Sequence, residues 1–183
     1  MSDRDKKPIL MNELGEYLKM IIFVVVVVFV INNFLLINAK IPSESMEKTI
    51  MTGDRIFGNR LAYLFEDPKR YDIVIFKNPD NEKQLYIKRI IGLPGETVTI
   101  VDGKVYIDGS ETPLDDSFTP EAMEGNFPEG GGTYEVPEGY YFMLGDNRNY
   151  SKDSRFWTNT YVAEDKILGK AIFRYFPSIK LLK

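Results

Sequence analysis

Thr97-Val98-Thr99-Ile100-Val101-Asp102-Gly103-Lys104-Val105-Tyr106-Ile107 is the segment of this chain with the plainest structural signal. Two runs of β-branched and aromatic residues flank an Asp-Gly pair. Such a pair favours a two-residue type I′ turn, because both of its residues tolerate a positive φ, and this turn joins antiparallel strands. The segment therefore predicts a β-hairpin over residues 97–107.

Further strand-like segments lie on both sides of this hairpin. They are rich in β-branched and aromatic residues and are bounded by turn formers such as Pro79 and Gly92-Leu93-Pro94-Gly95. They cover residues 71–76, 84–91, 140–144 and 167–176. Helical periodicity is weak beyond an apolar run near the N-terminus. We therefore predict an all-β domain of coiled, partly open antiparallel sheets.

Residues 108–137 interrupt the strand pattern with proline, glycine and acidic residues. The carboxylates of this stretch do not have the spacing of an EF-hand calcium loop. We interpret the stretch as a small surface insertion in the β domain, with no metal bound there.

The composition excludes several kinds of chemistry. The 183 residues include no histidine and no cysteine, which excludes a Ser-His-Asp triad, thiolate catalysis and disulfides. The commonest transition-metal ligands are missing for the same reason, so we expect neither a metal nor another cofactor. The net charge is −4 and no basic patch stands out, which argues against a nucleic-acid partner.

Residues 18–37 form a long apolar run, LKMIIFVVVVVFVINNFLLI. As a helix it would be about 30 Å long, enough to cross the hydrocarbon core of a bilayer. A cleaved signal peptide is disfavoured because Leu36 or Ile37 would occupy the −3 position, where small residues are required. A buried core helix is the other alternative. We predict an uncleaved transmembrane anchor.

The charges around the run predict its orientation. Arg4, Lys6, Lys7 and Lys19 precede or open it, whereas fewer basic residues follow closely. The positive-inside rule then predicts a cytoplasmic segment at 1–17, the anchor at 18–37 and an extracytoplasmic β domain at 38–183 in a single-pass protein of the cell membrane.

Ser45 lies shortly after the anchor, and without histidine its remaining common base is a lysine amine with a lowered pKa. Lys88 is a candidate, because it lies in a predicted strand between Tyr86 and Ile90. Both faces of that strand carry apolar residues, so the pattern does not decide whether Lys88 or Arg89 points inward. An exposed strand lysine is the alternative. Burial that lowers the pKa of Lys88 to about 8 would leave the amine able to act as a general base.

Polar residues gather in Gly145-Asp146-Asn147-Arg148-Asn149-Tyr150-Ser151-Lys152-Asp153-Ser154-Arg155, which follows a predicted strand. One reading is a turn laced by surface ion pairs, which contribute little. The other is a rigid loop that orients a catalytic residue. Residue types alone do not separate these readings.

Several strings together resemble the type I signal peptidases, which are membrane-anchored Ser-Lys proteases. They are Pro42-Ser43-Glu44-Ser45-Met46, Gly53-Asp54, Tyr71-Asp72-Ile73-Val74, Lys88-Arg89-Ile90-Ile91-Gly92-Leu93-Pro94-Gly95-Glu96 and the string from Gly145 to Arg155, in this order behind an anchor. The resemblance implies that the chain removes signal peptides from exported preproteins at the outer membrane surface, after small residues at −3 and −1. It also implies the coiled β fold that signal peptidases share with self-cleaving Ser-Lys repressors, and a variable insertion at about 108–137.

The resemblance also implies roles for individual residues. Ser45 would be the nucleophile, Lys88 the general base, and Ser43 with the Ser45 backbone N–H the oxyanion hole. Ser151 would hydrogen-bond the lysine. The ion-paired support of the site would be Asp146, Arg148, Asp153, Arg155 and Arg89, with Asp146 pairing Arg89. The shallow pockets for the substrate would be lined by Ile41, Pro42, Met46, Ile50, Tyr86 and Ile87.

Two alternatives accompany this prediction. A catalytically silent, membrane-anchored relative in surface-protein assembly would lack Ser45 or Lys88, and both are present. A self-cleaving repressor would need a DNA-binding domain where the apolar run stands. One position departs from the family pattern, since Lys48 occupies the place of a usual proline and leaves the backbone after Ser45 less restricted.

Overall fold

The computed structural model describes residues 3–124 and 131–182. Contacts divide the chain into two units, residues 1–36 and residues 37–183. The first unit is helical and the second contains nearly all of the β structure. Residues 1–2 of the predicted cytoplasmic segment and 125–130 of the predicted insertion lie outside the described residues.

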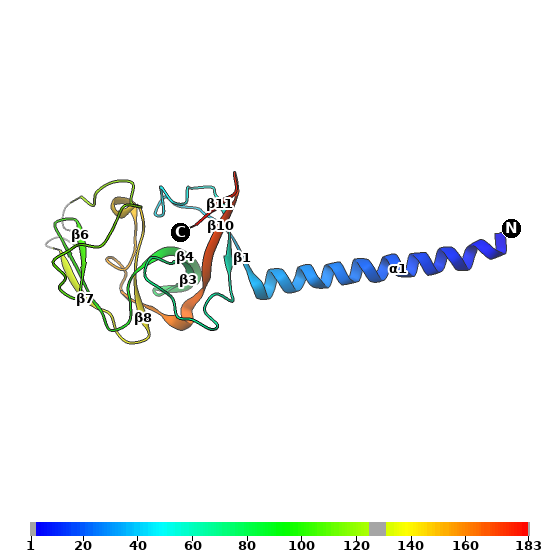
Figure 1. The fold of residues 1–183 in the computed structure, drawn as a ribbon, viewed down its shortest axis with the longest axis horizontal. Helices are drawn as coiled ribbons and strands as arrows, with labels where there is room; N and C mark the ends of the chain where they lie inside the picture. Colours follow the sequence, from blue (N-terminus) through cyan, green and yellow to red (C-terminus); the bar gives the residue numbers. More distant parts are fainter. Residues whose placement is uncertain (1–2, 125–130, 183) are drawn as a thin grey trace. The chain divides into compact units, whose positions relative to one another are not determined.

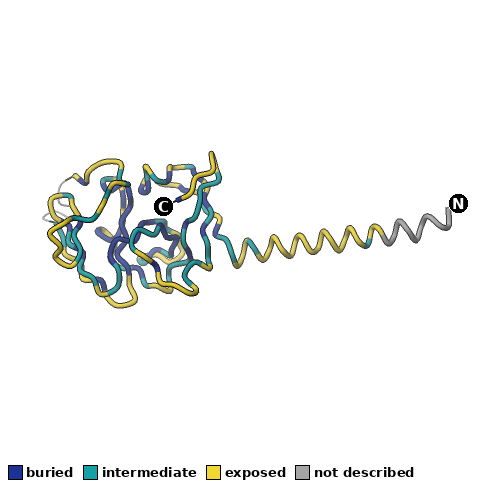
Figure 2. Tube along the Cα trace, viewed as in Figure 1, coloured by how far each residue is buried: buried dark blue, intermediate teal, exposed yellow. Residues whose placement is uncertain are grey.

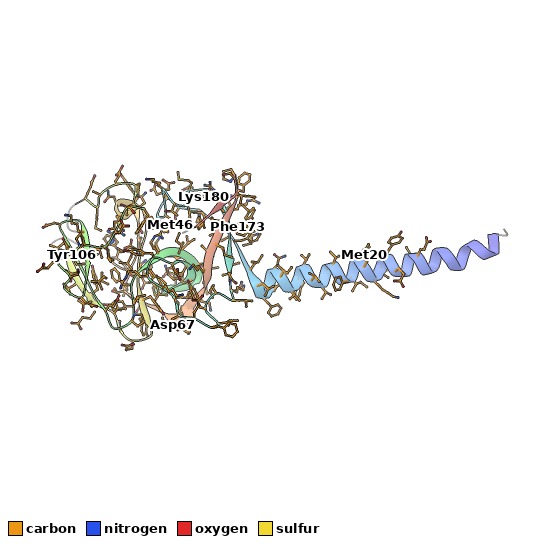
Figure 3. All side chains as sticks on the ribbon, in the orientation of Figure 1. Met20, Met46, Asp67, Tyr106, Phe173 and Lys180 are labelled. Carbon is orange, nitrogen blue, oxygen red and sulfur yellow. The ribbon has the colours of Figure 1, made fainter. Side chains whose placement is uncertain are left out.

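The first unit consists of helix α1 (Asp3–Val30), which continues as one π-helical turn, η1 (Ile31–Leu35). Within the described residues it is the one helix apolar and long enough to cross a membrane, over Glu13–Leu35 with a mean hydropathy of 2.5. Side chains such as Met20 project from it without being buried by the protein (Figure 3). The helix is compatible with the single-pass anchor that the sequence predicts.

The predicted span extends two residues beyond the helix. Leu36 and Ile37 belong to strand β1 (Leu36–Lys40). Ile37 is 4% exposed in a hydrophobic cluster of the β domain. Its apolar side chain therefore serves the core of the domain, which hydropathy alone does not distinguish from a place in the bilayer.

The larger sheet contains most of the strands (Figure 1). Its order is β1, β2 (Arg55–Asn59), β10 (Ile167–Phe176), β3 (Ile73–Asn78), β4 (Asn81–Gly92), β8 (Tyr140–Leu144) and β9 (Val162–Ala163), with β11 (Lys180–Leu181) paired to β10. The pairs from β2 to β9 are antiparallel. Two short 3-10 turns, η2 (Arg148–Tyr150) and η3 (Glu164–Lys166), follow β8 and β9.

The smaller sheet has the order β6 (Lys104–Ile107), β5 (Thr97–Val101) and β7 (Gly132–Glu135). Its first two strands are the predicted hairpin. Asp102 and Gly103 have φ values of 49° and 71°, and Val101 pairs with Lys104. Two successive positive φ values are what a type I′ turn requires, so the predicted turn is confirmed.

Three hydrophobic clusters fill the β domain, and the buried parts of the trace run through its interior in Figure 2. Successive residues of β4 serve different clusters, since Ile90 packs in one and Ile91 in another. The end of β4 is therefore buried on both faces. This explains why Lys88 and Arg89 are both buried although they point in opposite directions.

The all-β prediction for the second unit is confirmed, with each predicted strand segment found as β3, β4, β5, β6, β8 or β10. β7 lies inside the stretch interpreted as an irregular insertion. There Gly132 opens a strand whose Tyr134 pairs with Val98. Pairing to β5 makes this segment a strand, and its own residue types do not predict one.

Candidate active site

Ser45 lies in the segment between β1 and β2, and this segment is fixed to the domain at both ends. The backbone N–H of Ile41 donates to the Asp54 carbonyl at 2.9 Å, and that of Gly53 donates to the Ile41 carbonyl at 2.8 Å. Ser45 itself is 5% exposed. Its hydroxyl therefore has a defined position beside the sheet.

Lys88 meets Ser45 from strand β4, where it pairs with Val74 of β3. Its Nζ donates a hydrogen bond to the Ser45 Oγ. Burial lowers the pKa of Lys88 to about 8, against smaller opposing effects of the Asp153 and Asp146 carboxylates. The structure thus contains a serine and a buried lysine of low basicity in contact, as the sequence predicted.

A groove of about 670 Å³ opens beside this pair. Strand β4 pairs with β3 along most of its length, whereas its pairing with β8 begins at Arg89. The other edge of β4 before Arg89 faces the groove, which is lined by Pro42, Ser43, Glu44, Ser45, Thr52, Leu85, Tyr86, Ile87, Lys88, Tyr150 and Lys152. A strand edge of this kind offers backbone groups to an extended peptide.

Half of the predicted substrate-binding residues line the groove, namely Pro42, Tyr86 and Ile87. The other three predicted residues, Ile41, Met46 and Ile50, do not line this groove. These three are 2%, 0% and 0% exposed and pack in the core with Ile37 and Ile56 (Met46 is labelled in Figure 3). Their apolar surface is used to fix the Ser45 segment, so little of it remains for a ligand.

Sequence reasoning missed Thr52, Leu85, Tyr150 and Lys152 as groove residues. Leu85 lies two residues before the predicted Ile87 and therefore on the same face of the strand, so strand alternation was a signal for it. Tyr150 and Lys152 flank Ser151 in the string from Gly145 to Arg155. Their position in the groove follows from the fold of that loop, for which the sequence offers no pattern.

Ser43 is exposed, and its hydroxyl lies 3.5 Å from the Ser45 Oγ. It therefore stands next to the nucleophile candidate on the groove side, as expected of an oxyanion-hole donor. Lys48, which replaces the family proline, is exposed and does not line the groove.

The loop of residues 145–155, hereafter the site loop, is joined to the Ser45 segment. The Asn147 backbone N–H donates to the Ser45 carbonyl at 3.1 Å, and its side-chain amide donates to the Glu44 carbonyl at 3.2 Å. A Cβ added to Gly145 would collide with the Ser45 carbonyl and the Ser151 Oγ. The absence of a side chain at Gly145 thus permits the close approach of loop and nucleophile.

Ser151 is buried in this contact, but its predicted hydrogen bond to Lys88 is not formed. Its Oγ has no hydrogen-bond partner within residues 3–124 and 131–182. The Lys88 amine is bonded to Ser45 instead. The resemblance correctly places Ser151 in the loop beside Ser45, but the hydrogen bond predicted for it is absent because the Lys88 amine donates to Ser45.

Two buried ion pairs support the site, and both involve predicted residues. Arg89 donates to the two carboxylate oxygens of Asp146 at 2.8 and 2.7 Å, which confirms their predicted pairing. Arg155 pairs with Asp153 in the same bidentate manner at 2.8 and 2.9 Å. Bidentate geometry fixes direction as well as distance. Both pairs are buried, so the reading as a turn laced by surface ion pairs does not apply to them.

Arg148, the remaining predicted support residue, has a partner that the sequence did not indicate. It binds Asp116 of the insertion at 2.6 and 2.7 Å. The two residues are far apart in sequence, and Asp116 stands in a stretch with several acidic residues, so no local pattern selects it.

Comparison with known proteins gives consistent matches. The family described as "Signal peptidase, peptidase S26" matches residues 14–176. The chain is 37% identical over 177 residues to signal peptidase I of Leptolyngbya laminosa, covering 93% of this chain and 83% of that protein. It is 36% identical over 180 residues to signal peptidase I of Bacillus licheniformis, covering 94% of each. A crystal structure of a signal peptidase I from Enterococcus faecalis V583 matches with a TM-score of 0.47 and 36% identity, over 57% of this chain and 97% of that one.

Proposed function

Because the chain belongs to the signal peptidase family, peptidase S26, we propose that Ser45 and Lys88 are the pair with which it cleaves signal peptides. It is a serine endopeptidase of the signal peptidase I type, and its substrates are preproteins that carry signal peptides. The observation that carries the proposal is the contact between the Lys88 amine and the Ser45 hydroxyl beside an open groove. A catalytically silent relative is not favoured, because both residues are present and in contact.

In the proposed reaction the neutral Lys88 amine takes the proton from the Ser45 hydroxyl while the Ser45 oxygen attacks the scissile carbonyl carbon. The oxyanion that forms is stabilised by the Ser43 hydroxyl and the Ser45 backbone N–H. Lys88 then gives its proton to the leaving amine, and the acyl-enzyme is released by water that Lys88 deprotonates in turn. Lys88 therefore makes every proton transfer of the reaction, and no histidine is required.

The protonated amine has to be held after it has taken the serine proton. We assign this role to Ser151, because its buried hydroxyl lies close to Gly145, as the Ser45 carbonyl does, and has no hydrogen-bond partner in the described part of the chain. Its oxygen can accept a hydrogen bond from the ammonium. Asp146 and Asp153 favour the same protonated state electrostatically.

The substrate is proposed to bind as an extended strand along the free edge of β4, next to Tyr86 and Ile87. Residues alternate between the two sides of such a strand, so the −1 and −3 side chains point the same way. Both side chains would then lie beside Ser45, and as in the signal peptidase family we propose that they are small.

For the membrane, we propose that α1 anchors the protein in the bilayer with its N-terminus in the cytoplasm and residues 38–183 outside. The apolar window Glu13–Leu35 and the basic residues that precede it support this topology. The mechanism requires no metal. The test introduces a cysteine by Lys104→Cys and measures its accessibility to thiol reagents on each side of the membrane. A cysteine that is labelled only from the cytoplasmic side would contradict the proposed topology.

The experiment for the proposed function uses the full chain in detergent micelles and a preprotein with alanine at −1. We expect cleavage at a single bond after that alanine, identified by the N-terminal sequence of the product. Phenylalanine at −1 should reduce the rate by roughly 100-fold, since a small pocket excludes it. A preprotein that is left intact under these conditions, or cut equally well in both forms, would overturn the proposal.

The rate of cleavage should depend on the protonation state of Lys88. Because burial lowers the pKa of Lys88 to about 8, the amine is largely neutral above pH 8 and becomes charged and inactive below it. We expect kcat/KM to fall by roughly 50-fold from pH 8 to pH 6. A profile that keeps rising to pH 10 would show that the amine is not desolvated as proposed.

A further inference from the structure

Part of the insertion, residues 116–124, lies against the site loop, and we call it the strap. We propose that the strap positions the site loop for the reaction of Ser45 with Lys88, with Asp116 and Phe118 as positioning residues. The inference rests on the proposed function and adds to it a role for a segment outside the predicted site.

Asp116 anchors the strap to the site loop through Arg148. The Arg148 side chain is 1% exposed and its guanidinium donates to both Asp116 oxygens, while its Nε donates to the Gly145 carbonyl at 3.1 Å. The Asp116 side chain is 25% exposed, so it approaches the buried cation from the surface. Without the Asp116 carboxylate, the Arg148 guanidinium would remain buried but would have lost its bidentate partner.

Phe118 joins the strap to two cations at once. The Arg89 guanidinium carbon lies 4.2 Å from the centroid of the Phe118 ring, and that of Arg148 lies 5.8 Å from it. The Tyr71 ring meets the same phenylalanine edge-on at 5.7 Å between centroids. The Phe118 ring thus contacts the guanidinium groups of Arg89 and Arg148, and cation–π attraction holds these two side chains in place.

Beyond Phe118 the strap binds the site loop at two further points. The Asn149 side chain accepts from the Glu124 N–H at 2.9 Å and donates to the Ala122 carbonyl at 3.1 Å. Arg155 contacts the Met123 sulfur at 3.5 Å. The contacts therefore extend along the loop from Arg148 to Arg155 and do not depend on a single ion pair.

The positions held by the strap are linked directly to the reacting groups. Arg89, under Phe118, orients Asp146, whose carboxylate also accepts from the Thr49 hydroxyl in the Ser45 segment. Arg148, under Asp116, holds the Gly145 carbonyl, and Gly145 touches Ser45 and Ser151. A displacement of the strap would thus move Ser151 and the Ser45 segment relative to Lys88. Small displacements of reacting groups have large effects on rate.

The test compares Asp116→Asn with Asp115→Asn in the full chain, using a fluorogenic peptide that spans a signal-peptide cleavage site. Asp115 is adjacent and exposed, and asparagine at 115 keeps an acceptor for the Ser117 N–H. We expect Asp116→Asn to lower kcat by roughly 10- to 100-fold with KM within about twofold of the wild type. Asp115→Asn should stay within about twofold in both constants. Asp116→Glu should restore most of kcat, since it restores the charge.

Phe118→Leu is the second variant, because it keeps an apolar side chain and removes the ring. Phe118→Leu should lower kcat several-fold with unchanged KM. If Asp116→Asn does not fold, Phe118→Leu alone tests whether the strap positions the site loop. The melting temperature and the fluorescence of Trp157, the single tryptophan, monitor folding in each variant. Wild-type kcat in both folded strap variants would overturn the inference alone, whereas a wild-type enzyme that does not cleave the peptide would overturn the proposed function.

Discussion

Replacing Lys88 by methionine is expected to lower the rate of signal-peptide cleavage by about 1,000-fold or more. The chain contains no histidine that could take over as base, and Lys88 is the amine in contact with the Ser45 hydroxyl. Methionine has a similar length and no basic group. The measurement is single-turnover cleavage of a preprotein by the variant in detergent, compared with Ser45→Ala.

The same substitution should leave the fold intact. Lowering the pKa of Lys88 from 10.5 to about 8 corresponds to a cost of roughly 3 kcal/mol for keeping the charged amine in this site at low pH. An apolar side chain does not bear this cost, so we expect Lys88→Met to unfold at the same or a higher denaturant concentration. The loss of activity would then have a chemical cause and not a structural one.

Lys83→Met is the matched control, since Lys83 lies on the same strand, is exposed and is outside the groove. Its activity should equal that of the wild type. Cleavage by Lys88→Met or Ser45→Ala at more than about one hundredth of the wild-type rate would contradict the assignment of the pair.

Local patterns predicted those features that depend on neighbours in sequence. The Asp102-Gly103 turn needs only a residue pair that tolerates positive φ, and the strand around Lys88 needs only its β-branched neighbours. Ser45 and Lys88 themselves were reached by exclusion of other bases and then by resemblance. Their contact joins residues 43 positions apart and required the fold.

Features that depend on tertiary packing were not predictable in this way. Ile41, Met46 and Ile50 are apolar and close to Ser45, and nothing in the sequence distinguishes a residue that lines a pocket from one that fills the core. Asp116 is one of several acids in an irregular stretch, and its selection by Arg148 follows from where the strap crosses the site loop. In both cases the deciding quantity is burial, which is set by segments distant in sequence.

The pairing of Arg89 with Asp146 should matter most for stability. The two side chains are 2% and 0% exposed, so Arg89→Met leaves a carboxylate buried without its counter-ion. We expect the free energy of unfolding to fall by about 3 to 5 kcal/mol. The measurement is equilibrium unfolding in urea of the β domain within the full chain, followed by the fluorescence of Trp157. Lys69→Met is the control, because its ion pair with Glu66 is exposed and its loss should leave the unfolding midpoint unchanged.

Removing both charges separates the energetic role of the pair from its geometric role. In Arg89→Met/Asp146→Leu no buried charge remains unpaired, so most of the lost stability should return. Thr49, which donates to Asp146, is half-buried and can bond to water instead. Activity should not return with stability, because Phe118 would have lost one of its two cations and Thr49 its link to the site loop. A double variant that regained both stability and kcat would show that the pair only balances charge and does not orient the loop around Ser45.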